Sequence, residues 1–175
     1  MYTRILVALD RSPMSEQVFQ QAIDVAKATN ATVMLLHVLS PDEEGSPDIS
    51  LMREEYYPGL SSEIAELHRQ QWRDFEAQGI EVLRDRSEQA RRVGVKAAFE
   101  QFFGTPSRAI CDYARKWKAD LIILGRRGHS GLKELFLGSV SNYVLHHALA
   151  SVLTIQSNSQ ESIQDSQKKQ VEALP

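Results

Sequence analysis

The chain has 175 residues, 42% of them hydrophobic, and a formal net charge of −3. This length supports one domain with a sizeable core and is short for two. Acidic and basic residues are mixed along the chain, which excludes the basic groove of a nucleic-acid-binding protein and the basic patch of a membrane-surface protein. No apolar run reaches the roughly twenty residues of a transmembrane helix. The N-terminus lacks a signal-peptide cleavage site, and the lone Cys111 allows no internal disulfide, so we expect a cytoplasmic protein.

Two continuous apolar runs near the N-terminus predict buried strands with a helix between them. The runs RILVAL (4–9) and TVMLLHVL (32–39) do not alternate with polar residues, which is typical of strands covered on both faces of a parallel sheet. Residues 13–29 are the expected helix, with Ser12 as its N-cap and Pro13 at its first position. Its buried face combines four residues at helical spacing, namely Val18, Ala22, Val25 and Ala26.

Residues 40–59 differ in composition from the segments around them. Three prolines, two glycines and six acidic residues in this stretch predict a mobile surface insertion. A long helix is expected from 61 to 92, with Gly79 as a kink or break and Gly94 as its C-cap. Its buried stripe is predicted from its apolar residues, which are Ile64, Leu67, Phe75, Val82, Leu83 and Val93.

The second half of the chain continues the alternation. The expected elements are strands at 95–102, 120–124 and 151–156 and helices at 106–117 and 139–150. From residue 157 the chain is polar and without aromatic residues, so 157–175 is predicted to be a disordered tail. The predicted α/β domain is therefore 1–156, an open doubly wound five-stranded parallel sheet with helices on both faces. Ligands of such sheets bind beyond the carboxyl ends of the strands, here after Leu9, Val38 and Leu124.

The segment after the fourth expected strand has the glycines and hydroxyls of a phosphate site. It runs from Gly125 through Gly128 to Gly138 and Ser139, where the last helix is expected to begin. Glycines let a backbone approach an anion, and free N–H groups at a helix N-terminus favour phosphate. Ser139 and Ser141 would add hydroxyl donors. A plain turn at Gly125 and a simple cap at Gly138 are the alternative interpretation, and the segment is no P-loop.

Other polar residues also have structural interpretations. Asp10 could bind a ligand or cap the following helix. We expect His37 to be a packed core histidine and Cys111 to pack as a small apolar side chain. His129 lies inside the glycine segment and could contact phosphate or face solvent. The adjacent histidines near 146 lack the spacing of a metal pair on a helix, and no GxSxG nucleophile motif occurs.

Several motifs in order give the sequence its resemblance to a known family. They are ILVALD ending at Asp10, LLHV ending at Val38, Gly104-Thr-Pro, DLIILG, and Gly125 and Gly128 followed after nine residues by Gly138-Ser139. Over residues 2–156 the sequence resembles the nucleotide-binding branch of the universal stress protein family. The resemblance implies a Rossmann-like fold with strand order 3-2-1-4-5, an adenine nucleotide as ligand, a homodimer through strand 151–156 and a role in the stress response.

The resemblance also implies ligand roles for matching positions. Ala8 and Asp10 would lie beside the nucleoside, with Asp10 next to the ribose or a phosphate-bound Mg²⁺, and the backbone of Val38 would contact adenine. The glycine segment would surround the phosphates, through Gly125, Gly128, Gly138, Ser139, Val140 and Ser141. Leu124, Arg127 and His129 are further candidates for nucleotide binding; Arg127 could reach phosphate, contact acids of a partner or lie in a solvated loop. The last strand begins with Ala150-Ser151, in place of the X-Pro step frequent in the family.

The predicted function is binding of ATP or AMP, with Mg²⁺ accompanying ATP, by a regulatory or stress-response homodimer. A slow ATPase or a nucleotidyl-transfer enzyme on the same scaffold is the alternative. HIGH-like and SGGxDS-like signatures of such transferases are absent, and Asp10 and His129 are the candidate bases near the predicted phosphates. We therefore expect at most weak ATP hydrolysis, no nucleic-acid or membrane partner, and a further protein partner.

Overall fold

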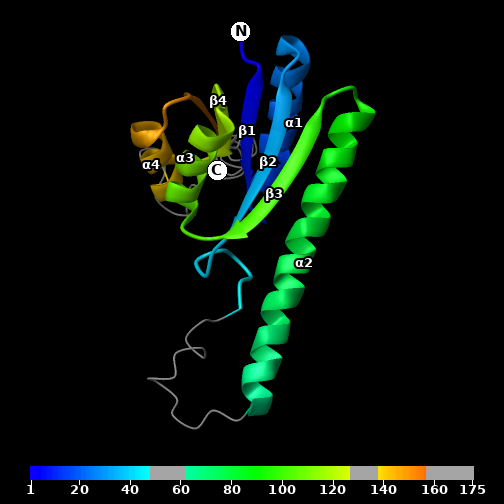
Figure 1. Cartoon of the computed structure of the whole chain (residues 1–175), viewed down its shortest axis with the longest axis vertical. Coiled ribbons are helices and arrows are strands. Elements are labelled where there is room, and N and C mark those ends of the chain that lie inside the picture. Colours follow the sequence, from blue (N-terminus) through cyan, green and yellow to red (C-terminus); the bar gives the residue numbers. More distant parts are fainter. Residues whose placement is uncertain (48–61, 127–137, 157–175) are drawn as a thin grey trace, which may run out of the picture.

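The computed structural model describes residues 1–47, 62–126 and 138–156 (Figure 1). Its elements are β1 (Arg4–Leu9), α1 (Met14–Thr29), β2 (Thr32–Leu39), α2 (Ser62–Arg92), β3 (Ala97–Phe103), α3 (Pro106–Trp117), β4 (Leu121–Gly125), α4 (Ser139–His147) and β5 (Ser151–Ile155). Neighbouring strands are parallel, in the order β3-β2-β1-β4-β5. The predicted doubly wound sheet and its strand order are confirmed.

Helices cover both faces of the sheet, and each face has its own apolar core (Figure 1). On the face of α1 and α2, Phe19 belongs to one buried cluster with Val7. On the face of α3 and α4, Ile110 and Val144 belong to a second cluster with Leu6. Leu6 and Val7 are neighbours in β1 and point to opposite faces, because side chains alternate along a strand. Burial on both faces explains why the strands read as continuous apolar runs.

The register of the sheet brings three strand ends together beside β1. Leu9, the last residue of β1, pairs with His37 of β2, and Ala8 pairs with Leu124 of β4. The chain passes from β1 to β2 on one side and places β4 on the other, so the strand order reverses at β1. Such a switch point leaves a crevice beyond the carboxyl ends of the strands.

Most predicted boundaries agree with the structure to within a few residues. β1 and β2 occupy the predicted ranges, whereas β3 begins at Ala97 rather than at 95 and α4 ends at His147 rather than at 150. The prediction of Ser12 as the N-cap of α1 is wrong, because its hydroxyl and N–H both donate to the carboxylate of Asp10. Helix α1 has no side-chain cap, and Pro13 occupies the N-cap position.

Helix α2 is a continuous helix of 31 residues that extends beyond the end of the sheet (Figure 1). It is not broken at Gly79, and the predicted apolar stripe is right only at Phe75 and Leu83. The side chains of Ile64, Leu67, Val82 and Val93 are exposed. The buried positions are instead His68, Phe75, Gly79, Leu83, Ser87 and Ala90. Their spacing of three, four or seven residues is helical, but four of the six are not large apolar residues, so a hydrophobic pattern does not reveal them.

The C-terminus of α2 ends as predicted. Gly94 has φ +85°, a left-handed conformation that glycine adopts without a Cβ clash. The N–H of Val95 then bonds to the carbonyl of Ala90 at 3.0 Å, which satisfies one of the last carbonyls of the helix.

The segment after β2 is described as far as residue 47. Within it Ser40 and Glu43 are buried, and the Glu43 N–H donates to the Ser40 carbonyl at 3.1 Å. The rest of the expected insertion at 40–59 and the expected tail at 157–175 lie outside the described residues, so the mobility of both stays a prediction. Within the described ranges, no helix combines the length and the apolar character that crossing a membrane requires.

Candidate functional site

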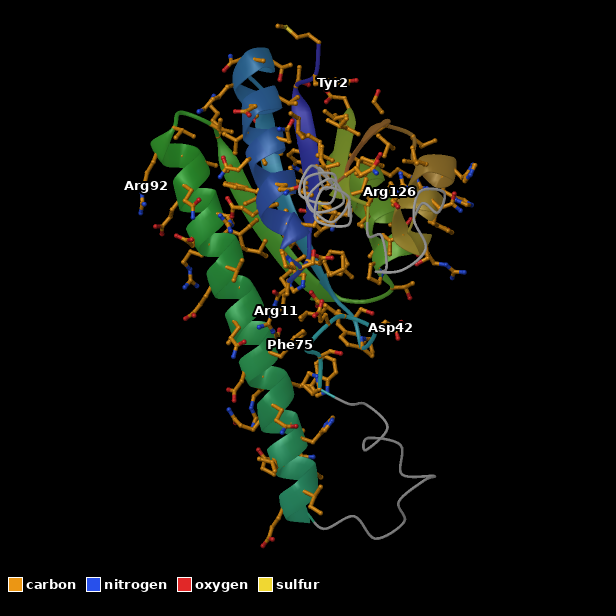
Figure 2. The ribbon with its side chains drawn as sticks, turned by 180° about the vertical axis from the view of Figure 1, so that it is seen from behind. Tyr2, Arg11, Asp42, Phe75, Arg92 and Arg126 are labelled. Atoms are coloured by element: carbon orange, nitrogen blue, oxygen red, sulfur yellow. The ribbon has the colours of Figure 1, made fainter. Side chains whose placement is uncertain are left out.

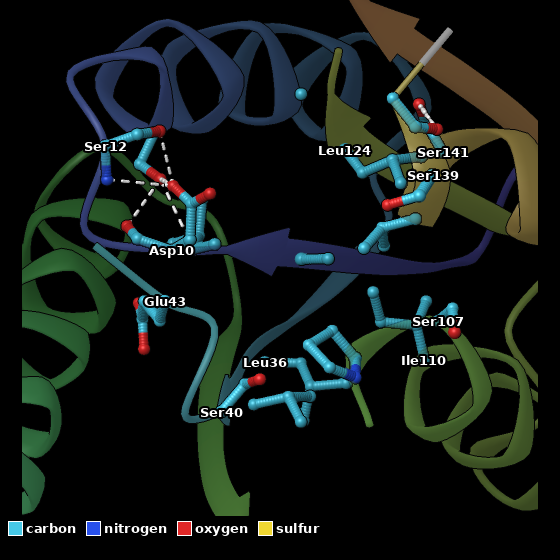
Figure 3. A pocket seen from close by; sticks show the side chains of 18 of the residues that line it. Asp10, Ser12, Leu36, Ser40, Glu43, Ser107, Ile110, Leu124, Ser139 and Ser141 are labelled. Carbon is cyan, nitrogen blue, oxygen red and sulfur yellow. Dashed lines mark hydrogen bonds between the residues drawn. The ribbon is translucent and has the colours of Figure 1, made fainter. Parts of the chain in front are cut away.

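A cavity of about 580 Å³ opens at the switch point of the sheet (Figure 3). Its volume is in the range of small-molecule sites. Nine of the twelve predicted site residues line it, namely Ala8, Asp10, Val38, Leu124, Gly125, Gly138, Ser139, Val140 and Ser141. Arg127, Gly128 and His129, the other three, lie outside the described residues. The structure thus brings residues from the ends of three strands and the start of α4 to one cavity.

Asp10 lies at one end of the cavity and is held by two serines (Figure 3). Its Oδ1 accepts the N–H of Ser12 at 2.9 Å, the Ser12 hydroxyl, and the Ser15 hydroxyl at 2.8 Å. The Asp10 N–H in turn donates to Ser15 Oγ at 2.9 Å. These bonds fix the carboxylate at the end of β1, so its orientation does not depend on a ligand.

The N-terminus of α4 lies at the other end of the cavity. Gly138 is its N-cap residue, and the first intrahelical bond of α4 runs from the Asn142 N–H to the Gly138 carbonyl at 2.8 Å. The N–H groups of the preceding residues, Ser139 to Ser141, belong to the first turn, where helical N–H groups have no intrahelical acceptor. The exposed Ser139 side chain lies beside them, whereas the buried Ser141 hydroxyl donates to the Gly138 carbonyl at 2.9 Å. This end of the cavity favours an anion.

An apolar wall lies between these two polar ends. Leu36, Val38, Ile110 and Leu124 are buried and line the cavity. The β1–β2 ladder ends at Leu9 and His37, and Val38 is the next residue along β2. Its backbone on the β1 side therefore lies beyond the described ladder and next to the cavity, where a flat polar ring could bond to it.

Two glycines of the predicted phosphate segment differ in what requires a glycine at their position. A Cβ on Gly125 would lie 2.8 Å from Cγ of Met14, so this glycine is required by the packing of α1 against β4. Gly138 has φ −56° and ψ 151°, which any residue can adopt. Only close approach of a ligand would therefore require glycine at position 138.

Several polar residues that line the cavity were not predicted as site residues. They are Ser12, Ser15, Ser40, Asp42, Glu43, Thr105 and Ser107. The spacing Asp-x-Ser-x-x-Ser from Asp10 indicates the two serines, because an aspartate at a turn commonly accepts bonds from nearby N–H and hydroxyl groups. The composition of residues 40–59 assigns Glu43 to a surface insertion, because composition does not reveal that Glu43 pairs with His37.

His37 and Glu43 form a buried pair beside the cavity, which Glu43 lines. Nε2 of His37 lies 2.8 Å from Oε1 of Glu43, and both side chains are 4% exposed. Burial lowers the pKa of His37, but the hydrogen bond and charge of Glu43, the bond to Gln101 and the charge of Asp10 outweigh it and raise the pKa above its usual 6.5. The prediction that His37 is a packed histidine is confirmed, with a charged partner that the sequence did not indicate.

The described residues hold no protein-only metal site. Within residues 1–47, 62–126 and 138–156, no group of three or more His, Cys, Asp or Glu side chains could hold an ion. The single carboxylate of Asp10 fits the way Mg²⁺ is usually held, by one or two carboxylates together with substrate phosphates.

Cys111 is buried, its pKa is raised by burial, and it packs in the α3–α4 core as predicted.

The sheet and its switch-point cavity define a Rossmann-like α/β domain with a candidate ligand site. A family model described as the universal stress protein family matches residues 1–156. The chain belongs to the universal stress protein family. It is 38% identical over 159 residues to the universal stress protein Sll1388 of Synechocystis sp., which covers 89% of this chain and 98% of that protein.

Solved structures share this fold. UspA from Lactobacillus plantarum superposes with a TM-score of 0.65 at 26% identity, over 88% of this chain and 97% of that one. A universal stress protein in complex with cAMP has a TM-score of 0.62 at 22% identity, over 90% and 98% of the two chains. A family protein from Arabidopsis thaliana with AMP bound has a TM-score of 0.57 at 20% identity, over 91% and 94%. At these last two identities the likeness shows the fold alone.

Proposed function

We propose that this chain binds an adenine nucleotide, ATP or AMP, in the switch-point cavity and acts as a regulatory protein of the stress response. The observation that carries the proposal is the order of groups along the cavity: a fixed carboxylate, an apolar wall, and a helix N-terminus with hydroxyls. A nucleotide presents the matching groups, namely ribose hydroxyls, a flat ring and phosphate. The family's structures with cAMP and AMP support adenine as the base.

The ligand's orientation follows from charge. Phosphate oxygens would accept from the first-turn N–H groups of α4 and from Ser139, with the helix dipole adding to the attraction. Adenine would pack on Leu36 and Ile110 and bond to the backbone of Val38. Asp10 would accept from ribose or help to hold a phosphate-bound Mg²⁺. Arg127, Gly128 and His129 of the glycine segment complete the phosphate site in this proposal.

The proposed assembly is a homodimer in the cytoplasm, formed by β5 of two copies. β5 is an edge strand of the sheet, and Leu153 on it is 37% exposed. The Ser151 N–H donates to the Asp120 carbonyl and the Ile155 carbonyl accepts from Arg126 N–H, so 151 and 155 direct their backbone groups inward. Backbone groups alternate along a strand, which places those of Val152 and Thr154 on the open edge, free to pair with a second chain.

The decisive experiment identifies the ligand that the protein itself retains. Protein purified without added nucleotide is denatured, and the released small molecules are identified by mass. Titration calorimetry with ATP and AMP then measures affinity. An adenine nucleotide in the released fraction or micromolar binding supports the proposal, and the absence of both overturns it. Sustained ATP turnover above about 1 per second would instead make the chain an enzyme.

A further inference from the structure

Both ring nitrogens of His37 face hydrogen-bond acceptors. Nε2 lies 2.8 Å from Oε1 of Glu43, and Nδ1 lies 2.8 Å from Oε1 of Gln101. The Gln101 amide is oriented by its own nitrogen, which donates to the carbonyl of Glu76 at 2.9 Å. A neutral imidazole carries one N–H and can satisfy one of these acceptors, whereas an imidazolium donates to both. The geometry therefore selects the doubly protonated form of His37.

The surroundings of His37 are negative. Four elements pack around it and contribute the following groups: Asp10 after β1, Glu43 after β2, Gln101 on β3, and Gly79 with the Glu76 carbonyl on α2. The guanidinium of Arg11 lies over the ring of Phe75, 4.5 Å from its centroid, and donates to Gln78 (Figure 2). Two carboxylates thus act on His37 without a competing cation in direct contact among the described residues.

The position of Glu43 depends on this histidine. Its Oε1 accepts from His37 and, at 3.2 Å, from the Arg11 N–H. Its Oε2 is buried and has no hydrogen-bond partner within the described part of the chain. Once His37 is neutral, its single N–H can serve Glu43 or Gln101 but not both, and the buried carboxylate loses the positive charge that offsets its burial in a low dielectric. Movement of Glu43 toward water would relieve this cost and would carry Ser40 and Asp42, which line the cavity, with it.

We propose that His37 is a positioning residue for the cavity. As an imidazolium it holds the segment 40–43 against the cavity, and loss of one ring proton releases that segment. This inference rests on nucleotide binding in the cavity as proposed above. The sign follows from linkage: the pKa of His37 in the folded chain is raised, so the stabilisation is complete below the unfolded value of 6.5 and is lost as pH rises through the raised value. Nucleotide affinity is then higher at low pH and falls as His37 deprotonates.

The test compares two loop variants over a pH series. The dissociation constant for ATP is measured by calorimetry between about pH 6 and 9, and His37 is titrated by NMR of its ring nitrogens. In the parent chain the affinity falls roughly three- to tenfold across the His37 titration, because a smaller fraction of molecules then has segment 40–43 in the binding-competent position. Glu43→Gln removes the carboxylate whose burial His37 offsets, so it moves the His37 titration to lower pH and abolishes the step in affinity. Glu44→Gln removes an equal charge from an exposed neighbour and moves neither.

Titration of the ATP phosphates is common to all variants and cancels in the comparison. A pH-independent affinity in the parent chain overturns the inference, and so does a step that stays in place while the His37 titration moves. If the parent chain binds no ATP at any pH, the proposed function fails, and protection of the amides of Ser40, Asp42 and Glu43 against hydrogen exchange still decides the inference. Protection that does not fall as His37 deprotonates refutes it. Should Glu43→Gln not fold, Gln101→Leu at a half-buried position removes the other acceptor and keeps the carboxylate, so the step in affinity must move to lower pH together with the His37 titration.

Discussion

A Cβ placed on Gly79 of α2 would lie 2.2 Å from Oε1 of Gln101 on β3. The same Cβ would lie 2.9 Å from Nδ1 of His37. The middle of a long helix is an unfavourable place for glycine, which costs about 1 kcal/mol relative to alanine. Here the missing side chain leaves room for the hydrogen bond between His37 and Gln101. The lower helix propensity of glycine is therefore offset by a polar network between α2, β2 and β3.

We therefore expect Gly79→Ala to bring no gain in stability. Helix propensity alone predicts an increase of about 1 kcal/mol in the free energy of unfolding. The displaced Gln101 loses its bonds to His37 and to the Glu76 carbonyl, each worth about 0.5–1.5 kcal/mol, so the net change is zero or a loss. Urea denaturation measures it. Ala77→Gly, at an exposed position of the same helix, is the control and should cost the full propensity difference. A more stable Gly79→Ala protein would contradict this account.

Adenine nucleotides should stabilise the folded protein more than guanine nucleotides. A ligand at a hundred times its dissociation constant adds about 2.7 kcal/mol, which corresponds to about 5–10 °C in melting temperature for a chain of this size. Guanine presents donors where adenine presents acceptors, so the Val38 backbone would not pair with it in the same way. Thermal unfolding with ATP, AMP and GTP at equal concentration checks this. Equal shifts from ATP and GTP would argue against adenine recognition at Val38.

Much of this fold can be predicted from the sequence because its strands are short, apolar and separated by clear helix signals. β1 and β2 are predicted to the residue, since burial on both faces leaves an unambiguous run. The buried face of α2 cannot be predicted in the same way. It contains Gly79 and Ser87, whose burial depends on Gln101 and on the Ala97 carbonyl of β3, which Ser87 Oγ meets at 3.2 Å. Such contacts join residues distant in sequence and leave no periodic signal.

The residues of the candidate site likewise include some that the sequence predicts and one, Glu43, that it does not. Asp10 and Gly138 are predictable because each directly flanks an element whose end the sequence marks, and Val38 because it lies at the marked end of β2. Glu43 is not, because its partner His37 lies within an apolar run, where a histidine reads as an isolated core residue. The pair becomes visible only when the chain turns back on itself between residues 40 and 46, where the Ser46 N–H meets the Glu43 carbonyl.

The edge strand offers a test of the proposed homodimer. Val152→Pro removes an N–H that points away from β4, so it should dissociate a dimer built on β5 without breaking the parallel ladder of the monomer. Leu153→Pro removes an inward N–H and should destabilise the fold itself. Val152→Ala keeps the N–H and should stay dimeric. Sedimentation at tens of micromolar distinguishes these cases, and a monomeric parent protein would refute the proposed dimer.

Ser139→Ala tests the hydroxyl at the N-terminus of α4. The side chain of Ser139 is exposed at the cavity, so its removal should leave the fold unchanged. One hydrogen bond to a charged oxygen is worth roughly 1.5–3 kcal/mol, and its loss should weaken ATP binding by about one to two decades. Ser151→Ala, an exposed serine at the start of β5 and away from the cavity, is the matched control. Calorimetric titration with ATP measures both, and equal affinities would remove Ser139 from the site.

Gly138→Val should abolish nucleotide binding while the protein stays folded. The φ and ψ of Gly138 are accessible to valine, so the substitution creates no backbone strain, and α4 keeps its N-terminal dipole. The loss would therefore be steric, because a branched side chain would occupy the space through which phosphate approaches the first-turn N–H groups. Gly138→Ala adds a single methyl group and should give an intermediate affinity. Circular dichroism first establishes that both variants retain helix and strand, and titration with ATP then ranks them. A folded Gly138→Val protein with the affinity of the parent would make Gly138 a helix cap alone and would place the phosphates elsewhere in the cavity.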